Sequence, residues 1–120
     1  LSTANDYARF LQMTLNGGEL DGQRILSRKT IELMTTDHLG GIPFRDGQGF
    51  GLGFFVVTDL GERGTLGSER EYGWGGAYHT TYWVDPAEEL VVVYLTQLIP
   101  AQGIDDYSKL RSGIYQAIID

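Results

Sequence analysis

The apolar residues near the start of the chain recur at the spacing of an amphipathic helix. They run from Ala4 to Leu15, and positions three or four apart fall on one face. Thr3 and Asp6 stand in the spacing of a capping box at the start of this run, and Gly17-Gly18 ends it. The pattern therefore predicts a first helix.

Two further helices are predicted from capping residues that precede apolar positions. Ser27 is a good N-cap for a helix that carries Ile31 and Met34, and Asp105 can cap a terminal helix. Between the first two helices, the Asp-Gly pair at 21–22 predicts a tight turn that joins two short apolar pieces.

Glycine occupies every second position in residues 47–53. In a strand this spacing puts all four glycines on one face, so that a helix or a ligand can approach the backbone closely. We expect one strand that begins there and continues through the bulky residues up to Val57. Residues 37–48 are predicted to hold no regular element, and residues 59–70 to form a surface loop.

Three strands are predicted at residues 72–76, 79–84 and 90–97, with a hairpin turn at 85–89. The last of them has no polar alternation, which predicts a central strand covered on both faces. The order of elements predicts an α+β fold with a mainly antiparallel sheet flanked by helices, in a single domain over residues 1–120.

Composition narrows the range of functions. Sixteen acidic and nine basic residues give a net charge of −7 without a basic stripe, which argues against nucleic acid as a partner. No cysteine is present, so disulfides and Cys-ligated zinc are excluded. We find no apolar run of ~18 residues and no signal-peptide pattern. The chain begins at Leu1 rather than Met, and we expect it to be part of something longer.

The run Trp74-Gly75-Gly76-Ala77 lies in the first strand of the predicted meander. It resembles the third motif of the serine β-lactamase and penicillin-binding-protein superfamily, which is Lys-Thr-Gly in most members and Trp-Gly-Gly or a relative in some esterase-like members. Other segments that look like successive landmarks of the C-terminal part of that family are residues 2–11, 17–18, 49–54 and 84–86. The resemblance covers nearly the whole chain in the right order.

The resemblance implies a role for each residue of the motif. Trp74 takes the lysine position, Gly75 the threonine position and Gly76 the glycine position, and Ala77 offers a backbone N–H that stabilises an oxyanion. His79 is a candidate substrate contact, although a histidine in a partly exposed strand is more often structural. The implied chemistry is acyl-enzyme hydrolysis of an ester, a β-lactam or a D-alanyl peptide without metal or cofactor. The uncharged Trp74 favours an ester or a small amide over substrates whose carboxylate needs the lysine.

The rest of the family's active site is missing from this sequence. No serine is followed three residues later by lysine, and no tyrosine is followed two residues later by asparagine, so the nucleophile and base motifs are absent. We therefore expect the C-terminal portion of a larger hydrolase, which supplies one wall of a site for a small acyl substrate and is inactive as an isolated chain.

Weaker candidates have ordinary structural explanations. Asp37-His38 offers two metal-ligand types at poor ligand spacing, so no metal site is predicted. Glu69 and Glu71 alternate as a glycosidase pair would, but a solvated strand edge explains them better.

Alternatives to the hydrolase interpretation stay open at the level of sequence. The tryptophan and its glycines can belong to ordinary sheet packing. Cross-strand aromatic packing likewise explains Tyr78, Tyr82 and Trp83 as well as the rim of an acyl pocket does. A non-catalytic binding or interaction module that retains the sheet is the main rival. A third interpretation is that the chain associates with itself or with an N-terminal half of the same protein, because its apolar strand is otherwise partly uncovered.

Overall fold

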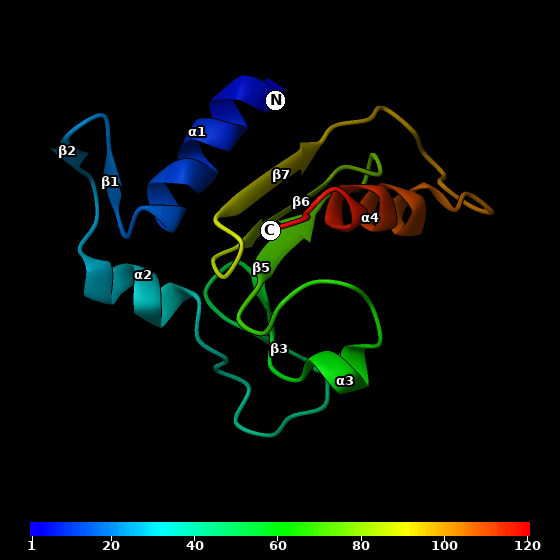
Figure 1. Ribbon diagram of the computed structural model, residues 1–120, viewed down its shortest axis with the longest axis horizontal. Helices are drawn as coiled ribbons and strands as arrows, with labels where there is room; N and C mark the ends of the chain where they lie inside the picture. The colour runs from blue at the N-terminus through cyan, green and yellow to red at the C-terminus, as the bar shows by residue number, and fades with distance from the viewer.

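The computed structural model describes all residues 1–120. It contains four helices, a two-stranded hairpin and a five-stranded sheet (Figure 1). In chain order the elements are α1 (Ala4–Leu15), β1 (Glu19–Leu20), β2 (Gln23–Arg24), α2 (Arg28–Met34), β3 (Gln48–Phe50), β4 (Phe55–Val57), α3 (Leu60–Arg63), β5 (Tyr72–Gly75), β6 (Thr81–Asp85), β7 (Leu90–Tyr94) and α4 (Asp106–Gln116). No helix has the length and apolar character needed to cross a membrane.

The main sheet has the strand order β3-β4-β5-β6-β7, and every neighbouring pair is antiparallel. Figure 1 shows α1 on one side of this sheet and α4 on the other. The predicted α+β fold with an antiparallel sheet flanked by helices is confirmed, and so is the three-strand meander, with strand ends that differ by at most three residues.

The predicted helix caps are present for α1 and α2. The N–H of Asp6 donates to Thr3 Oγ1 at 3.1 Å, and the N–H of Thr30 donates to Ser27 Oγ at 3.0 Å. Asp105 precedes α4 as predicted, but its carboxylate accepts from the Ser108 hydroxyl and caps no backbone N–H. The capping motifs are local in sequence, which is why they were predictable.

The predicted single strand over residues 47–57 is wrong. The chain turns back after Phe50, and β3 and β4 form a hairpin in which the N–H of Gly51 donates to the carbonyl oxygen of Phe54 at 2.8 Å. The expected close approach to the glycines is confirmed at Gly49 and Gly51, whereas Gly53, in the turn of the hairpin, has nothing within 4 Å. A Cβ on Gly49 would lie 2.2 Å from Asp37 Cγ, and one on Gly51 would lie 2.1 Å from the carbonyl oxygen of Met34. The segment that follows α2 occupies this face.

The strand β7 is not central, contrary to the prediction. It forms one edge of the sheet, next to β6 only. Both of its faces are nevertheless covered, since Val91 and Val93 pack in the cluster under α1 and Val92 packs in the cluster under α4. An unbroken apolar run indicates that side chains on both faces of the strand are buried. It does not indicate whether the strand has one neighbouring strand or two.

Two apolar clusters fill the two faces of the sheet. The cluster on the α1 side is centred on Leu11, Val56, Tyr72 and Val84. The cluster on the α4 side contains four buried residues, Phe55, Val57, Trp83 and Val92. The segment predicted as a surface loop at 59–70 also contains the short helix α3, whose first turn is capped by Asp59. The candidate site lies at the C-terminal end of β5, beside these two clusters.

Candidate active site

One edge of β5 is open where the tryptophan motif begins. β5 pairs with β6 along its whole length, but β4 reaches only as far as Gly73. Just beyond the strand, the N–H of Gly76 donates to the carbonyl oxygen of Thr80 at 3.1 Å. The next N–H, that of Ala77, donates to no acceptor of the protein, and Ala77 is exposed. A free backbone donor therefore lies at the end of this open edge.

The glycines of the motif allow Thr80, the residue before β6, to approach closely. A Cβ on Gly75 would lie 2.6 Å from the carbonyl oxygen of Thr80, and one on Gly76 would lie 2.7 Å from its hydroxyl oxygen. Such distances are far inside normal contact, so a side chain at either position would displace the turn that carries Ala77. The glycines thus set the position of the free N–H as well as leaving the strand edge open.

Trp74 is half-buried in an aromatic cluster. Its ring packs edge-on against Phe50, with 5.1 Å between centroids, and lies nearly parallel to Phe44 at 6.4 Å. The guanidinium carbon of Arg45 lies 5.2 Å from the centroid of the Trp74 ring and 4.9 Å from that of Phe44. Trp74, which stands at the lysine position of the motif, is itself neutral. The guanidinium of Arg45 places a positive charge over the face of its ring.

Two cavities meet at the turn after β5. The first, of about 530 Å³, is named here the arginine-side cavity because Arg45, Arg63 and Arg111 line it. The second, of about 730 Å³, is named the tyrosine-side cavity because Tyr7, Tyr78 and Tyr82 line it. Both volumes suit small molecules. Gly76, Ala77 and Thr80 line both cavities, so the free N–H of Ala77 belongs to the ridge between them.

Glu71 is completely buried, and two arginines neutralise it. Its carboxylate accepts from Arg63 at 2.6 Å and from Arg111 at 2.6 and 3.0 Å. Arg63 and Arg111 also line the arginine-side cavity. The interpretation of Glu71 as part of a solvated strand edge is wrong, because its side chain is buried between Arg63 of α3 and Arg111 of α4. Glu69 is exposed.

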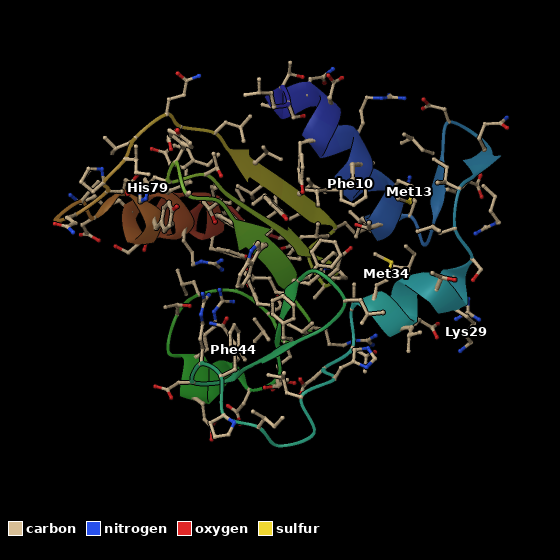
Figure 2. All side chains as sticks on the ribbon, turned by 180° about the vertical axis from the view of Figure 1, so that it is seen from behind. Phe10, Met13, Lys29, Met34, Phe44 and His79 are labelled. Carbon is tan, nitrogen blue, oxygen red and sulfur yellow. The ribbon has the colours of Figure 1, made fainter.

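His79 lines neither cavity. Its Nε2 lies 2.7 and 3.0 Å from the two carboxylate oxygens of Asp106, and its ring stacks on Tyr107 with 4.1 Å between centroids. Because the carboxylate only accepts, Nε2 carries the proton. The hydrogen bond from His79 holds the pKa of Asp106 below its ordinary value. In Figure 2 His79 lies beside α4, where it fastens the turn after β5 to that helix.

Asp37 and His38, which the sequence analysis considered as metal ligands, instead make contacts with the backbone. Asp37 Oδ1 accepts from the N–H of Leu39 and of Phe50, and His38 Nε2 contacts the carbonyl oxygen of Leu33. No group of three or more His, Cys, Asp or Glu side chains is arranged to hold a metal ion.

Four polar residues of the arginine-side cavity are not predicted as site residues from the sequence: Arg45, Gln48, Arg63 and Arg111. Arg45 and Gln48 line the arginine-side cavity from the segment that was predicted to lack regular structure. The only local signal is Asp46-Gly47, a pair that favours a tight turn, and it gives no hint that the turn reaches Trp74.

Comparison with known proteins identifies related chains over nearly the whole sequence. The family model described as Beta-lactamase matches residues 1–109. Protein Rv1367c of Mycobacterium tuberculosis is 40% identical over 116 residues, which cover 87% of this chain and 29% of the relative. A protein of Escherichia coli O157:H7 named putative D-alanyl-D-alanine carboxypeptidase is 31% identical over 98 residues, which cover 79% of this chain and 21% of that protein.

Solved structures share the fold. EstCE1, described as a hydrolase with promiscuous acyltransferase activity, superposes with a TM-score of 0.80 at 27% identity, covering 95% of this chain and 30% of its own. A putative 6-aminohexanoate-dimer hydrolase from Bacillus anthracis has a TM-score of 0.63 at 21% identity, covering 96% of this chain and 28% of its own, which is a likeness of fold alone. The chain spans less than a third of each of these relatives.

Proposed function

This chain belongs to the Beta-lactamase family, and on that premise we propose that it forms the oxyanion-stabilising wall of a serine hydrolase site for a small ester or amide. The observation that carries the proposal is the unbonded N–H of Ala77 on the ridge between two cavities. A donor without a protein partner, set beside space for a ligand, is what an oxyanion site requires.

The chemistry proposed is acyl transfer through a covalent intermediate. A serine hydroxyl loses its proton to a base and attacks the acyl carbon, which puts the negative charge on the carbonyl oxygen. The N–H of Ala77 donates to that oxygen in the transition state. The intermediate then collapses, the alcohol or amine leaves with a proton, and water repeats the sequence to release the acid. EstCE1, a relative described as an acyltransferring hydrolase, supports this reaction class.

The two cavities suggest where the two parts of the substrate lie. With the reacting carbonyl at Ala77, one arm of the substrate enters the arginine-side cavity against Trp74 and Gly75, and the other enters the tyrosine-side cavity. Gly76 forms part of both walls. His79 acts through its bond to Asp106, by holding the turn, rather than by touching the substrate.

We place the nucleophile and its base on residues outside this sequence. The 120 residues contain neither Ser-x-x-Lys nor Tyr-x-Asn, and the related proteins are more than three times as long as the matched part. The chain is then one part of a larger hydrolase domain, and it has no activity by itself.

The test compares hydrolysis of p-nitrophenyl acetate by the protein in its natural sequence context with hydrolysis by the 120-residue chain alone. Turnover is expected only from the former. In the active form, Ala77→Pro removes the N–H and is expected to lower kcat about 10²- to 10³-fold, whereas Ala77→Ser keeps the N–H and most of the activity.

Circular dichroism spectra of both variants establish that the fold is retained. Robust turnover by the isolated chain contradicts the assignment of the nucleophile, and equal activity of the two Ala77 variants contradicts the oxyanion role. A natural-context protein that binds acyl compounds but hydrolyses none would favour a non-catalytic binding module.

A further inference from the structure

The turn that carries Ala77 is a three-residue hairpin loop between β5 and β6. The N–H of Gly76 donates to the carbonyl oxygen of Thr80 at 3.1 Å, and the N–H of His79 donates to that of Gly76, also at 3.1 Å. Loops of this length commonly place their last residue in the left-handed region, which glycine adopts most easily. His79 occupies this position with φ of +65°. The chain therefore carries a side chain where backbone geometry favours none.

The side chain of His79 makes a bond that glycine could not make. Its Nε2 donates to Asp106, the first residue of α4, with 2.7 and 3.0 Å to the two carboxylate oxygens. The hydroxyl of Tyr94 donates to Oδ2 of the same carboxylate at 3.0 Å. The side chains of His79 and Asp106 are only 12% and 25% exposed. A residue in an unfavourable backbone conformation persists where its surroundings hold it, and such positions indicate a functional constraint.

Tyr107, the second residue of α4, contacts the backbone of the same turn. Its hydroxyl donates to the carbonyl oxygen of His79 at 2.9 Å and to that of Thr80 at 3.3 Å. Its ring stacks on the imidazole of His79, with 4.1 Å between centroids and 5° between planes. The carbonyl oxygen of Thr80 is also the acceptor of the Gly76 N–H that closes the loop. Tyr107 therefore acts on the closing bond, one residue before the free N–H of Ala77.

The other end of the turn is fastened by the segment that follows β7. The carbonyl oxygen of Tyr78 accepts from the Thr96 hydroxyl at 2.5 Å and from the N–H of Leu98 at 3.2 Å. The turn is thus held through its carbonyl groups and the His79 side chain, while the N–H of Ala77 stays unbonded. A donor fixed in advance stabilises an oxyanion more strongly than a mobile one, because it needs no rearrangement during the reaction.

We propose that Asp106 and Tyr107 are positioning residues for the oxyanion donor, and that with His79 they form a clamp between α4 and the turn. The three residues are named here the α4 clamp. The clamp rests on the proposed function only in its consequence for catalysis, since its restraint on the turn exists without a substrate. His79 and Asp106 line neither cavity, so their substitution reaches the substrate only through the turn.

The first test measures amide hydrogen exchange by residue-resolved mass spectrometry, on the protein in its natural sequence context. Tyr107→Phe removes the hydroxyl and keeps the stacked ring. His79→Gly removes the bond to Asp106 and suits φ of +65°, so it relieves backbone strain. We expect each variant to accelerate exchange of the Gly76 amide about tenfold, with no change at Leu11 in the core. If backbone geometry alone set the turn, His79→Gly would leave this exchange unchanged or slow it.

The second test measures hydrolysis of p-nitrophenyl acetate by the same variants. Each is expected to lower kcat about tenfold and to change KM less than about twofold, because the turn affects the transition state rather than substrate binding. Tyr115→Phe is the matched control, since it removes a hydroxyl of α4 that bonds Asp85 and Trp83 and lines neither cavity. It is expected to lower stability without changing kcat or the exchange of Gly76.

Circular dichroism establishes that each variant is folded. Unchanged exchange of Gly76 in both Tyr107→Phe and His79→Gly, or equal acceleration in Tyr115→Phe, would overturn the clamp. Faster exchange with an unchanged kcat in an active protein would overturn the positioning role. Faster exchange in a natural-context protein that hydrolyses no ester would retain the clamp as a restraint on the turn and reject the proposed function.

Discussion

Arg111 of α4 and Glu71, next to β5, are joined by a two-point ion pair in the interior. Arg111 Nη2 lies 2.6 Å from Glu71 Oε1, and Arg111 Nη1 lies 3.0 Å from Oε2. The same guanidinium stacks on Trp83 at 4.3 Å and donates to the carbonyl oxygen of Leu66 at 2.9 Å. One side chain thus ties the terminal helix to the sheet and to the loop before β5, directly behind the arginine-side cavity.

Replacing Glu71 with glutamine is expected to lower the free energy of unfolding by about 3 kcal/mol or more, because two largely buried arginines then lose their carboxylate. Urea denaturation followed by circular dichroism measures the change. Glu69→Gln removes the same charge at an exposed position and is expected to change stability by less than about 0.5 kcal/mol. Similar losses in both variants would mean that the ion pair contributes nothing specific.

The bond between His79 and Asp106 predicts a pH dependence of stability. The pKa of Asp106 is held below its ordinary value of 3.8 in the folded chain by the hydrogen bond from His79. A carboxylate with a depressed folded pKa stabilises the fold above the unfolded pKa, and this contribution is lost as the pH falls through the folded pKa.

Asp106→Asn is therefore expected to be less stable than the unmodified chain at about pH 5, with a difference that shrinks toward pH 3 and below. Urea titrations at a series of pH values give the two curves. Asp120→Asn, an exposed substitution, is expected to follow the unmodified chain. A difference that stays constant from pH 5 to the acid limit would show that the carboxylate's charge has no part in the contact.

Gly51→Ala and Gly113→Ala are expected to change stability in opposite directions. A methyl group on Gly51 meets the carbonyl oxygen of Met34 at 2.1 Å, and this overpacking is expected to destabilise by about 1–3 kcal/mol. Gly113 lies exposed in α4 with nothing within 4 Å, so alanine is expected to stabilise by about 0.5–1 kcal/mol through helix propensity. Thermal unfolding of the two variants separates them, and a shift of the same sign in both would contradict the packing around β3.

Tyr72→Phe tests a buried hydrogen bond between α1 and β5. The hydroxyl of Thr14 donates to the carbonyl oxygen of Leu11 at 2.6 Å, so the Tyr72 hydroxyl is the donor in the 2.8 Å contact with Thr14. Its loss is expected to lower the free energy of unfolding by about 1 kcal/mol. Tyr78→Phe removes an exposed hydroxyl that makes no hydrogen bond and is the control; an equal effect of both would rule out a contribution from the pair.

Several features of the fold could be predicted because they depend on residues close together in the chain. The caps Thr3 and Ser27 each accept from an N–H three residues later, and the Asp21-Gly22 turn joins two adjacent strands. The meander around the tryptophan motif follows from strand patterns separated by short turns. The motifs between α1 and β7, taken in their order along the chain, were also sufficient to indicate the family.

Other features depended on contacts that only the folded chain brings about. Glu71 meets Arg111 across 40 residues of sequence, Arg45 reaches Trp74 from a loop, and the glycine-rich segment turns into a hairpin instead of continuing as one strand. The apolar residues of β7 predicted burial on both faces but not its place at the edge.

The sequence by itself thus determined the helices α1, α2 and α4, the meander and the motif that carries Ala77, because short-range periodicity and capping follow from backbone geometry over a few residues. The tertiary structure alone decided which charges are buried, which N–H remains unbonded and which side chains line the cavities. Those properties depend on the pairing of distant segments, and no local pattern encodes the partner that a side chain meets across the fold.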